Sequence, residues 1–223
     1  MNQLSVNPTK TITTLNRHAI ESQTADVLAD IYQDDINIAI WKRDLPLNIV
    51  KATERVLNAK KGFRFTASVT RKGTYDSLYN ALGANDDAQL ISADVTEMVD
   101  MFCCLFDLKQ VCLRLMALEN AMCPRFHVDR VPCRLVTTYS ETATQWLADQ
   151  DVDRSKLGMG SKGKSDEESG IYQATGNINQ LSCGHVALLK GESWLGNEGG
   201  GLVHRSPSLS NNKRRLLLTL DFN

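Results

Sequence analysis

Residues 125–129 read Arg-Phe-His-Val-Asp and contain the two residues on which the fold interpretation depends, His127 and Asp129. In a β-strand, side chains two positions apart point to the same face. A strand over this stretch therefore directs the imidazole and the carboxylate to one side, and Phe126 and Val128 to the other. We expect His127 and Asp129 to be neighbouring ligands of a metal ion, although the H-x-D pattern alone is common.

A third ligand is expected from His204, in the stretch Gly-Leu-Val-His-Arg-Ser-Pro. Two imidazoles and one carboxylate on one side of an ion leave the opposite positions open, as in non-haem Fe(II) oxygenases. Arg214 follows His204 by ten residues and shares its strand face with three leucines and Phe222. A guanidinium there can pair with both oxygens of a carboxylate. We expect Arg214 to face inward, and a register shift of one residue would select Arg215 instead.

Short strand-like runs separated by turn residues surround this group. They cover residues 110–117, 125–128, 133–139, 170–173, 177–181, 186–190, 202–204 and 214–222. Many short strands at such spacing predict a sandwich or barrel. Residues 151–170, rich in Gly, Ser, Lys, Asp and Glu, are predicted to form a mobile loop that covers the site.

The N-terminal part differs from the C-terminal part in its predicted secondary structure. Residues 21–109 predict a mixture of elements: helices from about residue 24, from Pro46 to about 60 and over 92–106, and strands over 36–41 and 63–70. Residues 1–20 are polar and predict a flexible arm. We therefore expect one domain over 21–223, with a mixed helix and strand half before residue 110.

Composition narrows the function classes. The 223 residues are 42% hydrophobic and 23% charged, the balance of an ordinary globular protein. A chain of this length forms a core without a metal ion or disulfides, so a bound metal is expected to serve a function. The formal net charge of −1 gives no overall attraction to nucleic acid or to an anionic membrane. We expect neither partner.

The chain ends and the cysteines predict a cytoplasmic protein. The first ten residues are polar, which does not predict a signal peptide, and the apolar runs are much shorter than a membrane span. The six cysteines lack the spacing of a disulfide framework, which is typical of reduced thiols.

Two other patterns compete with the metal hypothesis. Residues 158–165 match G-x-x-x-x-G-K-[ST], which cradles nucleotide phosphates when a strand precedes it and a helix follows. The flanking stretches DQDVDRSKL and DEESG predict neither element, so nucleotide binding is the third hypothesis. Zinc could instead use thiolates and imidazoles, although no C-x-x-C pair occurs. Its ligands would come from Cys123, His127, Cys133, Cys183 and His185.

The H-x-D, the distal His-Arg-Ser-Pro and the arginine ten residues beyond it resemble the signature of Fe(II)/2-oxoglutarate-dependent dioxygenases, particularly the phytanoyl-CoA-hydroxylase-like group. This resemblance covers residues from about 110 to 223. The whole chain also resembles an uncharacterised bacterial family of unknown function. The stretches that carry this second resemblance are Cys-Pro-Arg-Phe-His-Val-Asp-Arg, Leu-Leu-Lys-Gly-Glu and His-Arg-Ser-Pro.

The resemblance implies an α+β fold, in which an α/β N-terminal half packs on a C-terminal double-stranded β-helix, a cupin-like jelly roll. It implies that His127, Asp129 and His204 bind Fe(II) and that Arg214 binds the far carboxylate of 2-oxoglutarate. The implied activity is hydroxylation of a small-molecule substrate that the sequence does not identify. The alternative is a non-catalytic zinc-binding protein on the same fold.

Overall fold

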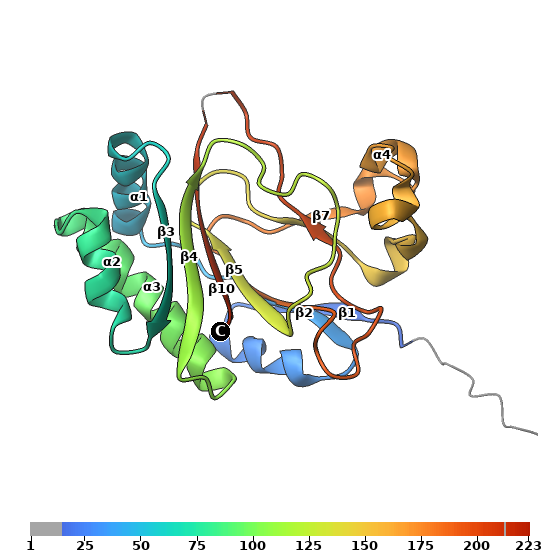
Figure 1. The fold of residues 1–223 in the computed structure, drawn as a ribbon, viewed down its shortest axis with the longest axis horizontal. Helices are drawn as coiled ribbons and strands as arrows, with labels where there is room; N and C mark the ends of the chain where they lie inside the picture. The colour runs from blue at the N-terminus through green and yellow to red at the C-terminus, as the bar shows by residue number, and fades with distance from the viewer. Residues whose placement is uncertain (1–14, 212) are drawn as a thin grey trace, which may run out of the picture.

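Two β-sheets form the centre of the computed structural model, which describes residues 15–211 and 213–223 (Figure 1). The larger sheet has seven strands, in the spatial order β1 (His18–Ser22), β2 (Ile36–Trp41), β8 (Val186–Lys190), β5 (Cys133–Thr138), β10 (Arg215–Phe222), β4 (Gln110–Leu118) and β3 (Arg64–Thr70). The smaller sheet has three, β7 (Ile178–Gln180), β6 (Gln145–Leu147) and β9 (His204–Arg205). All pairs are antiparallel except β1 with β2.

Helices cover one face of the larger sheet. They are the 3₁₀ helix η1 (Ala25–Tyr32) and the α-helices α1 (Leu47–Ala59), α2 (Thr74–Leu82) and α3 (Asp86–Leu105). Asn85 caps α3, since its side chain accepts a hydrogen bond from the backbone N–H of Ala88, and acidic residues occupy the first turn. Figure 1 shows α1, α2 and α3 together on this side of the sheet. Between helices and strands lies the largest apolar cluster, which includes Leu216, Leu218 and Leu220.

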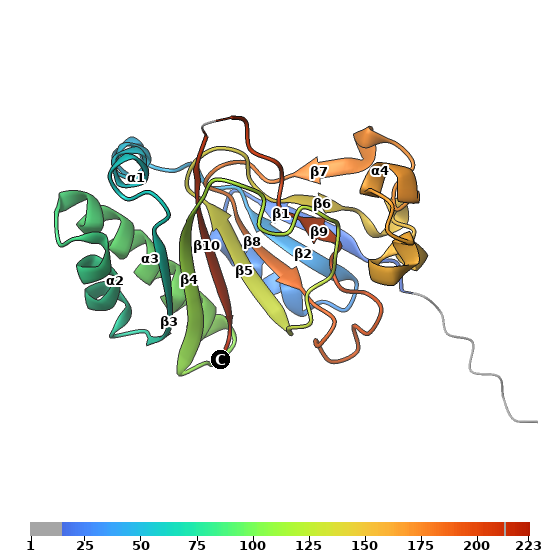
Figure 2. The same ribbon diagram turned by 45° about the horizontal axis from the view of Figure 1, so that its top comes forward.

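The smaller sheet lies over the opposite face of the larger one (Figure 2). A second apolar cluster fills the space between the two sheets and includes Val136, Trp146 and Leu217. Because neighbouring residues of a strand point to opposite faces, β10 contributes Leu217 to this inner cluster and Leu216 to the helix-covered one. His127 and His204, two of the predicted ligands, line a cavity beside Val136 and Leu217 of this cluster.

The segment predicted to be a mobile loop, 151–170, contains short helices. It follows β6 through η2 (Asp149–Asp151), and continues with η3 (Arg154–Lys156), η4 (Gly158–Ser161) and α4 (Asp166–Ser169), before η5 (Thr175–Asn177) leads into β7. A third apolar cluster attaches it to the smaller sheet and includes Phe126, Ile171 and Val203. Its mobility stays a prediction.

The α+β class is confirmed, and several element boundaries differ from those expected. Strands appear close to where alternation predicted β2, β3, β4 and β8, whereas α2 was not predicted and α3 begins at Asp86 rather than near 92. Residues 170–173 form no strand, and 125–128 form only a bridge at His127. Of the predicted arm, 1–14 lie outside the described residues, and β1 already begins at His18. None of the described helices has the length and apolar composition needed to cross a lipid bilayer.

Candidate metal centre

The structure brings His127, Asp129 and His204 together at the inner side of the smaller sheet. One ligand atom from each lies within 4.8 Å of the others, and this is the only such group of three or more among the described residues. His204 Nε2 lies 3.4 Å from Asp129 Oδ2, and His127 Nε2 lies 3.8 Å from Asp129 Oδ1. The expected juxtaposition is therefore present, and metal binding by these residues stays a prediction.

The backbone sets the spacing between the two histidines. His204 lies on β9, and His127 lies in the connection between β4 and β5. The backbone N–H of each donates to the carbonyl oxygen of the other, both at 3.0 Å. Because β9 has only two residues, the single bridge at His127 is sufficient to pair the two segments. The imidazole centroids lie 4.6 Å apart.

Each imidazole is oriented through its Nδ1 atom. His127 Nδ1 lies 2.9 Å from the carbonyl oxygen of Arg125, and His204 Nδ1 lies 3.1 Å from that of Leu202. A carbonyl oxygen accepts only from a protonated nitrogen, so both Nδ1 atoms carry hydrogen and both Nε2 atoms turn towards Asp129. Metal-binding histidines are held in this way, with one nitrogen fixed and the other offered to the ion.

Asp129 is held as a carboxylate by its surroundings. Burial raises its pKa, but the hydrogen bond with His204 and the charges of His204 and Arg134 outweigh burial and lower the pKa to about 2. Arg134 donates to Asp129 Oδ2 at 2.7 Å and also to both oxygens of Asp221, at 2.7 and 3.0 Å. Burial and the nearby His204 lower the pKa of His127, which favours the neutral imidazole that metal binding requires.

These donors fit an iron(II) ion. Two imidazole nitrogens and one carboxylate are the ligand set of non-haem iron centres, and zinc accepts the same set. The centre can therefore hold a divalent metal and leave part of its coordination sphere free.

The prediction that Arg214 faces this site is wrong. Its guanidinium donates to the carbonyl oxygen of Leu57 on α1, on the helix-covered side. Arg215, 1% exposed, instead lines the cavity that holds His127 and His204. The sequence interpretation took the face of Leu216, Leu218 and Leu220 as the barrel interior, whereas that face packs on the helices.

Arg215 is buried without a carboxylate partner among the described residues. It donates to Ser206 Oγ and, at 3.3 Å, to the carbonyl oxygen of Thr142, and its Nε–H has no partner. Thr219 Oγ1, on the same cavity wall, also has none. Burial lowers the pKa of Arg215 to about 10, so it stays charged at neutral pH. A buried charge without a counter-charge is costly.

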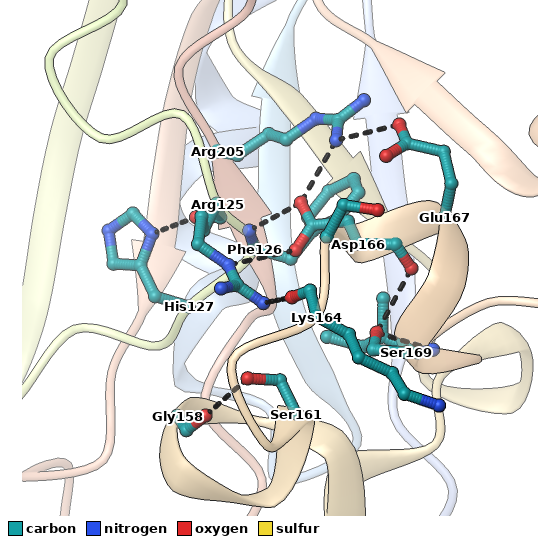
Figure 3. Close-up of polar contacts among 12 residues, drawn as sticks. Arg125, Phe126, His127, Gly158, Ser161, Lys164, Asp166, Glu167, Ser169 and Arg205 are labelled. Atoms are coloured by element: carbon teal, nitrogen blue, oxygen red, sulfur yellow. Dashed lines mark hydrogen bonds and ion pairs between the residues drawn. The ribbon is translucent and has the colours of Figure 1, made fainter.

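A second, polar cleft of about 640 Å³ adjoins the metal cavity, and the two share Arg205 and Ser206. Its walls come from the His127 segment, the β6 and β9 region and the 163–167 stretch. They consist mostly of hydrogen-bonding and charged side chains, which include Arg125, Gln145, Asp166 and Glu167. Figure 3 shows Arg125 and Arg205 directed towards Asp166 in this region.

The competing sequence hypotheses find less support in the geometry. The 3₁₀ helix η3, not a strand, precedes residues 158–165, and η4 lies within them. The helix that follows, α4, has only four residues, so the geometry that binds phosphate is missing there. All six cysteines are free, and none joins a ligand group of three within the described ranges. Burial raises the pKa of the Cys133 thiol, which disfavours the thiolate that zinc needs.

Three residues of the site had no role in the sequence interpretation: Arg134, Asp166 and Arg205. Arg205 follows a predicted ligand directly, which is a signal that could have identified it. Arg134 contacts Asp129, 5 residues away in the sequence, and Asp166 contacts residues 39–40 positions away. No local sequence pattern identifies either residue.

A dioxygenase for auxin oxidation from rice superposes with a TM-score of 0.52 at 11% identity, covering 92% of this chain and 82% of that chain. JOX2, solved in complex with 2-oxoglutarate, Fe and JA, superposes with a TM-score of 0.50 at 10% identity, covering 100% and 80%. At these identities the similarity shows the fold alone. This protein therefore has the double-stranded β-helix fold of the Fe/2-oxoglutarate dioxygenases, as expected.

Residues 22–221 match the family described as "Protein of unknown function (DUF1826)", and the chain belongs to this family. The resemblance to a family of unknown function is thereby confirmed. No curated protein matches the sequence.

Proposed function

We propose that this protein is an Fe(II)/2-oxoglutarate-dependent oxygenase. The observation that carries the proposal is a single cavity lined by His127, His204 and a buried arginine without a carboxylate partner, Arg215, with Asp129 beside the two histidines. A metal site alone does not require an adjacent buried positive charge. A co-substrate that chelates the metal at one end and carries a carboxylate at the other accounts for both.

In this proposal each side chain of the site has a separate role. His127, Asp129 and His204 bind the ion from one side, and Arg134 holds Asp129 in place. Arg215 replaces Arg214 as the partner of the far carboxylate of 2-oxoglutarate, where a guanidinium can pair with both oxygens. Bound together, iron and 2-oxoglutarate would supply the oxidising power to hydroxylate a substrate C–H bond with molecular oxygen.

We further propose that the substrate is a polar small molecule bound in the adjoining cleft. Its volume, about 640 Å³, is within the usual range for small-molecule sites. The shared residues Arg205 and Ser206 place the cleft directly beside the metal cavity. Its hydrogen-bonding walls favour a polar occupant over an apolar one.

An anaerobic titration tests the proposal. Metal-free protein receives Fe(II) and then 2-oxoglutarate, and the visible charge-transfer absorption of the chelated co-substrate is recorded. We expect the band in the wild type and its loss in His127→Ala. His185→Ala is the matched control, because His185 belongs to no three-ligand group in the described part of the chain, and it should retain the band.

Two results would contradict the proposal. Fe(II) binding without the band would exclude the co-substrate. Binding of zinc but not of iron would favour the alternative, a non-catalytic zinc-binding protein with the same three ligands.

A further inference from the structure

Asp166 is a buried carboxylate in a charged and otherwise exposed stretch. It is the first residue of α4, directly after the capping residue Ser165, and its side chain is only 5% exposed. Its neighbours Lys164 and Glu167 are exposed. Because burying a carboxylate is costly unless it is fully paired, its position requires specific partners.

Those partners belong to the two backbone segments that carry the metal-binding histidines (Figure 3). Asp166 Oδ2 accepts from the backbone N–H of Phe126 at 3.0 Å and from Arg205 Nη1 at 2.9 Å. Phe126 directly precedes His127, and Arg205 directly follows His204. The guanidinium of Arg205 also lies over the Phe126 ring, 4.3 Å from its centroid. One carboxylate thus joins both segments.

Further contacts strengthen this junction. Arg125 Nε lies 3.6 Å from Asp166 Oδ1, and the same guanidinium donates to the carbonyl oxygen of Lys164. Phe126 and Val203, which precede the two histidines, are both buried in the apolar cluster beneath the 151–170 segment. The segment is therefore attached to the histidine backbone through one polar cluster and one apolar cluster.

We propose that Asp166 is a positioning residue of the metal centre, which holds the backbone segments of His127 and His204 in the arrangement that binds one ion. The inference rests on the metal site of the proposed function and assigns a role to the 158–169 stretch that nucleotide binding does not explain. It has a reciprocal consequence. If the order of this stretch favours metal binding, metal binding must favour the order of the stretch by the same free energy.

The test uses Co(II) as the metal, because its visible spectrum reports the number and geometry of its ligands. Asp166→Asn keeps the side-chain shape and an oxygen for the Phe126 N–H, but removes the charge that pairs with two arginines. Asp153→Asn is the matched control, since the Asp153 carboxylate in the same segment is exposed. It hydrogen-bonds with Ser155 and lies 4.0 Å from Lys156 Nζ, and neither partner belongs to a histidine segment. Arg205→Gln removes the other half of the pair and gives an independent variant.

Three readouts are compared: the Kd for Co(II), the Co(II) spectrum, and the hydrogen exchange of the 158–170 amides with and without Co(II). In the wild type and in Asp153→Asn, Co(II) should slow exchange in this stretch. In Asp166→Asn and Arg205→Gln, we expect a Kd raised about tenfold, as for other residues that orient metal ligands, an altered spectrum, and loss of the protection.

The outcomes separate this inference from the proposed function. If the wild type binds Co(II) and Asp166→Asn binds it with unchanged Kd, spectrum and protection, Asp166 has only a structural role and the inference is wrong. A lower melting temperature of the metal-free variant would then reflect this structural role and would not support the inference. If the wild type binds no divalent metal at all, the proposed function fails first and the inference fails with it.

Discussion

The two faces of strand β10 differ in what they bury. Leu216, Leu218 and Leu220 face the helices and are completely shielded within an apolar cluster. Arg215 and Thr219 face the space between the sheets, equally buried, and both retain polar atoms without partners. An apolar face of this kind lowers the free energy of folding, whereas unpartnered polar groups raise it. The proposed binding of an anionic co-substrate would account for the unpartnered atoms of the second face.

The largest expected change in the free energy of unfolding comes from a substitution on the helix-covered face of β10. Leu218→Ala removes a fully buried side chain and leaves a cavity, so the free energy of unfolding should fall by about 2–5 kcal/mol. The affinity for a divalent metal should stay within threefold of the wild type. Urea unfolding and a Co(II) titration measure the two quantities. A large loss of metal affinity in the folded variant would contradict the view that the helix-covered face contributes to stability and not to metal binding.

A smaller effect on the free energy of unfolding is expected from the ionisation of Asp129, at the candidate metal centre. Its pKa of about 2 lies below the value of about 3.9 in an unfolded chain. Ionised Asp129 therefore stabilises the metal-free fold above about pH 4, and this contribution, about 2 kcal/mol, is lost as the pH falls towards 2.

Urea unfolding of metal-free wild type and Asp129→Asn between pH 7 and pH 2 measures this contribution. The difference between the two proteins should shrink as the pH falls. A difference that is constant over this range would show that the charge of Asp129 does not stabilise the fold.

Periodicity predicted most strands of the large sheet, and short motifs predicted the three candidate ligands. Alternation placed β2 and β3 to within a residue, because both strands have the hydrophobic pattern of a sheet. The H-x-D spacing and the distal His204 were sufficient to place three side chains together, although residues 125–128 form a bridge rather than a strand.

The face of β10 could not be predicted, for a physical reason. Leu216, Leu218, Leu220 and Phe222 make the face of Arg214 the more apolar one, and such a face can pack on helices as well as line a barrel interior. The apolar pattern therefore favoured Arg214, whereas the structure packs that face on the helices and leaves Arg215 on the face that lines the cavity. Asp166 was missed because its contacts join segments 39–40 residues apart.

The most direct test of the central claim compares these two arginines. The binding of 2-oxoglutarate to protein loaded with Zn(II), which supports no oxidation, is measured by calorimetry in wild type, Arg215→Leu and Arg214→Ala. Our account predicts that Arg215→Leu weakens binding at least about thirtyfold, as expected when a charge-assisted pair worth about 2 kcal/mol or more is lost, and that Arg214→Ala leaves binding unchanged. Equal binding by wild type and Arg215→Leu would contradict the assignment of the cavity to an anionic co-substrate.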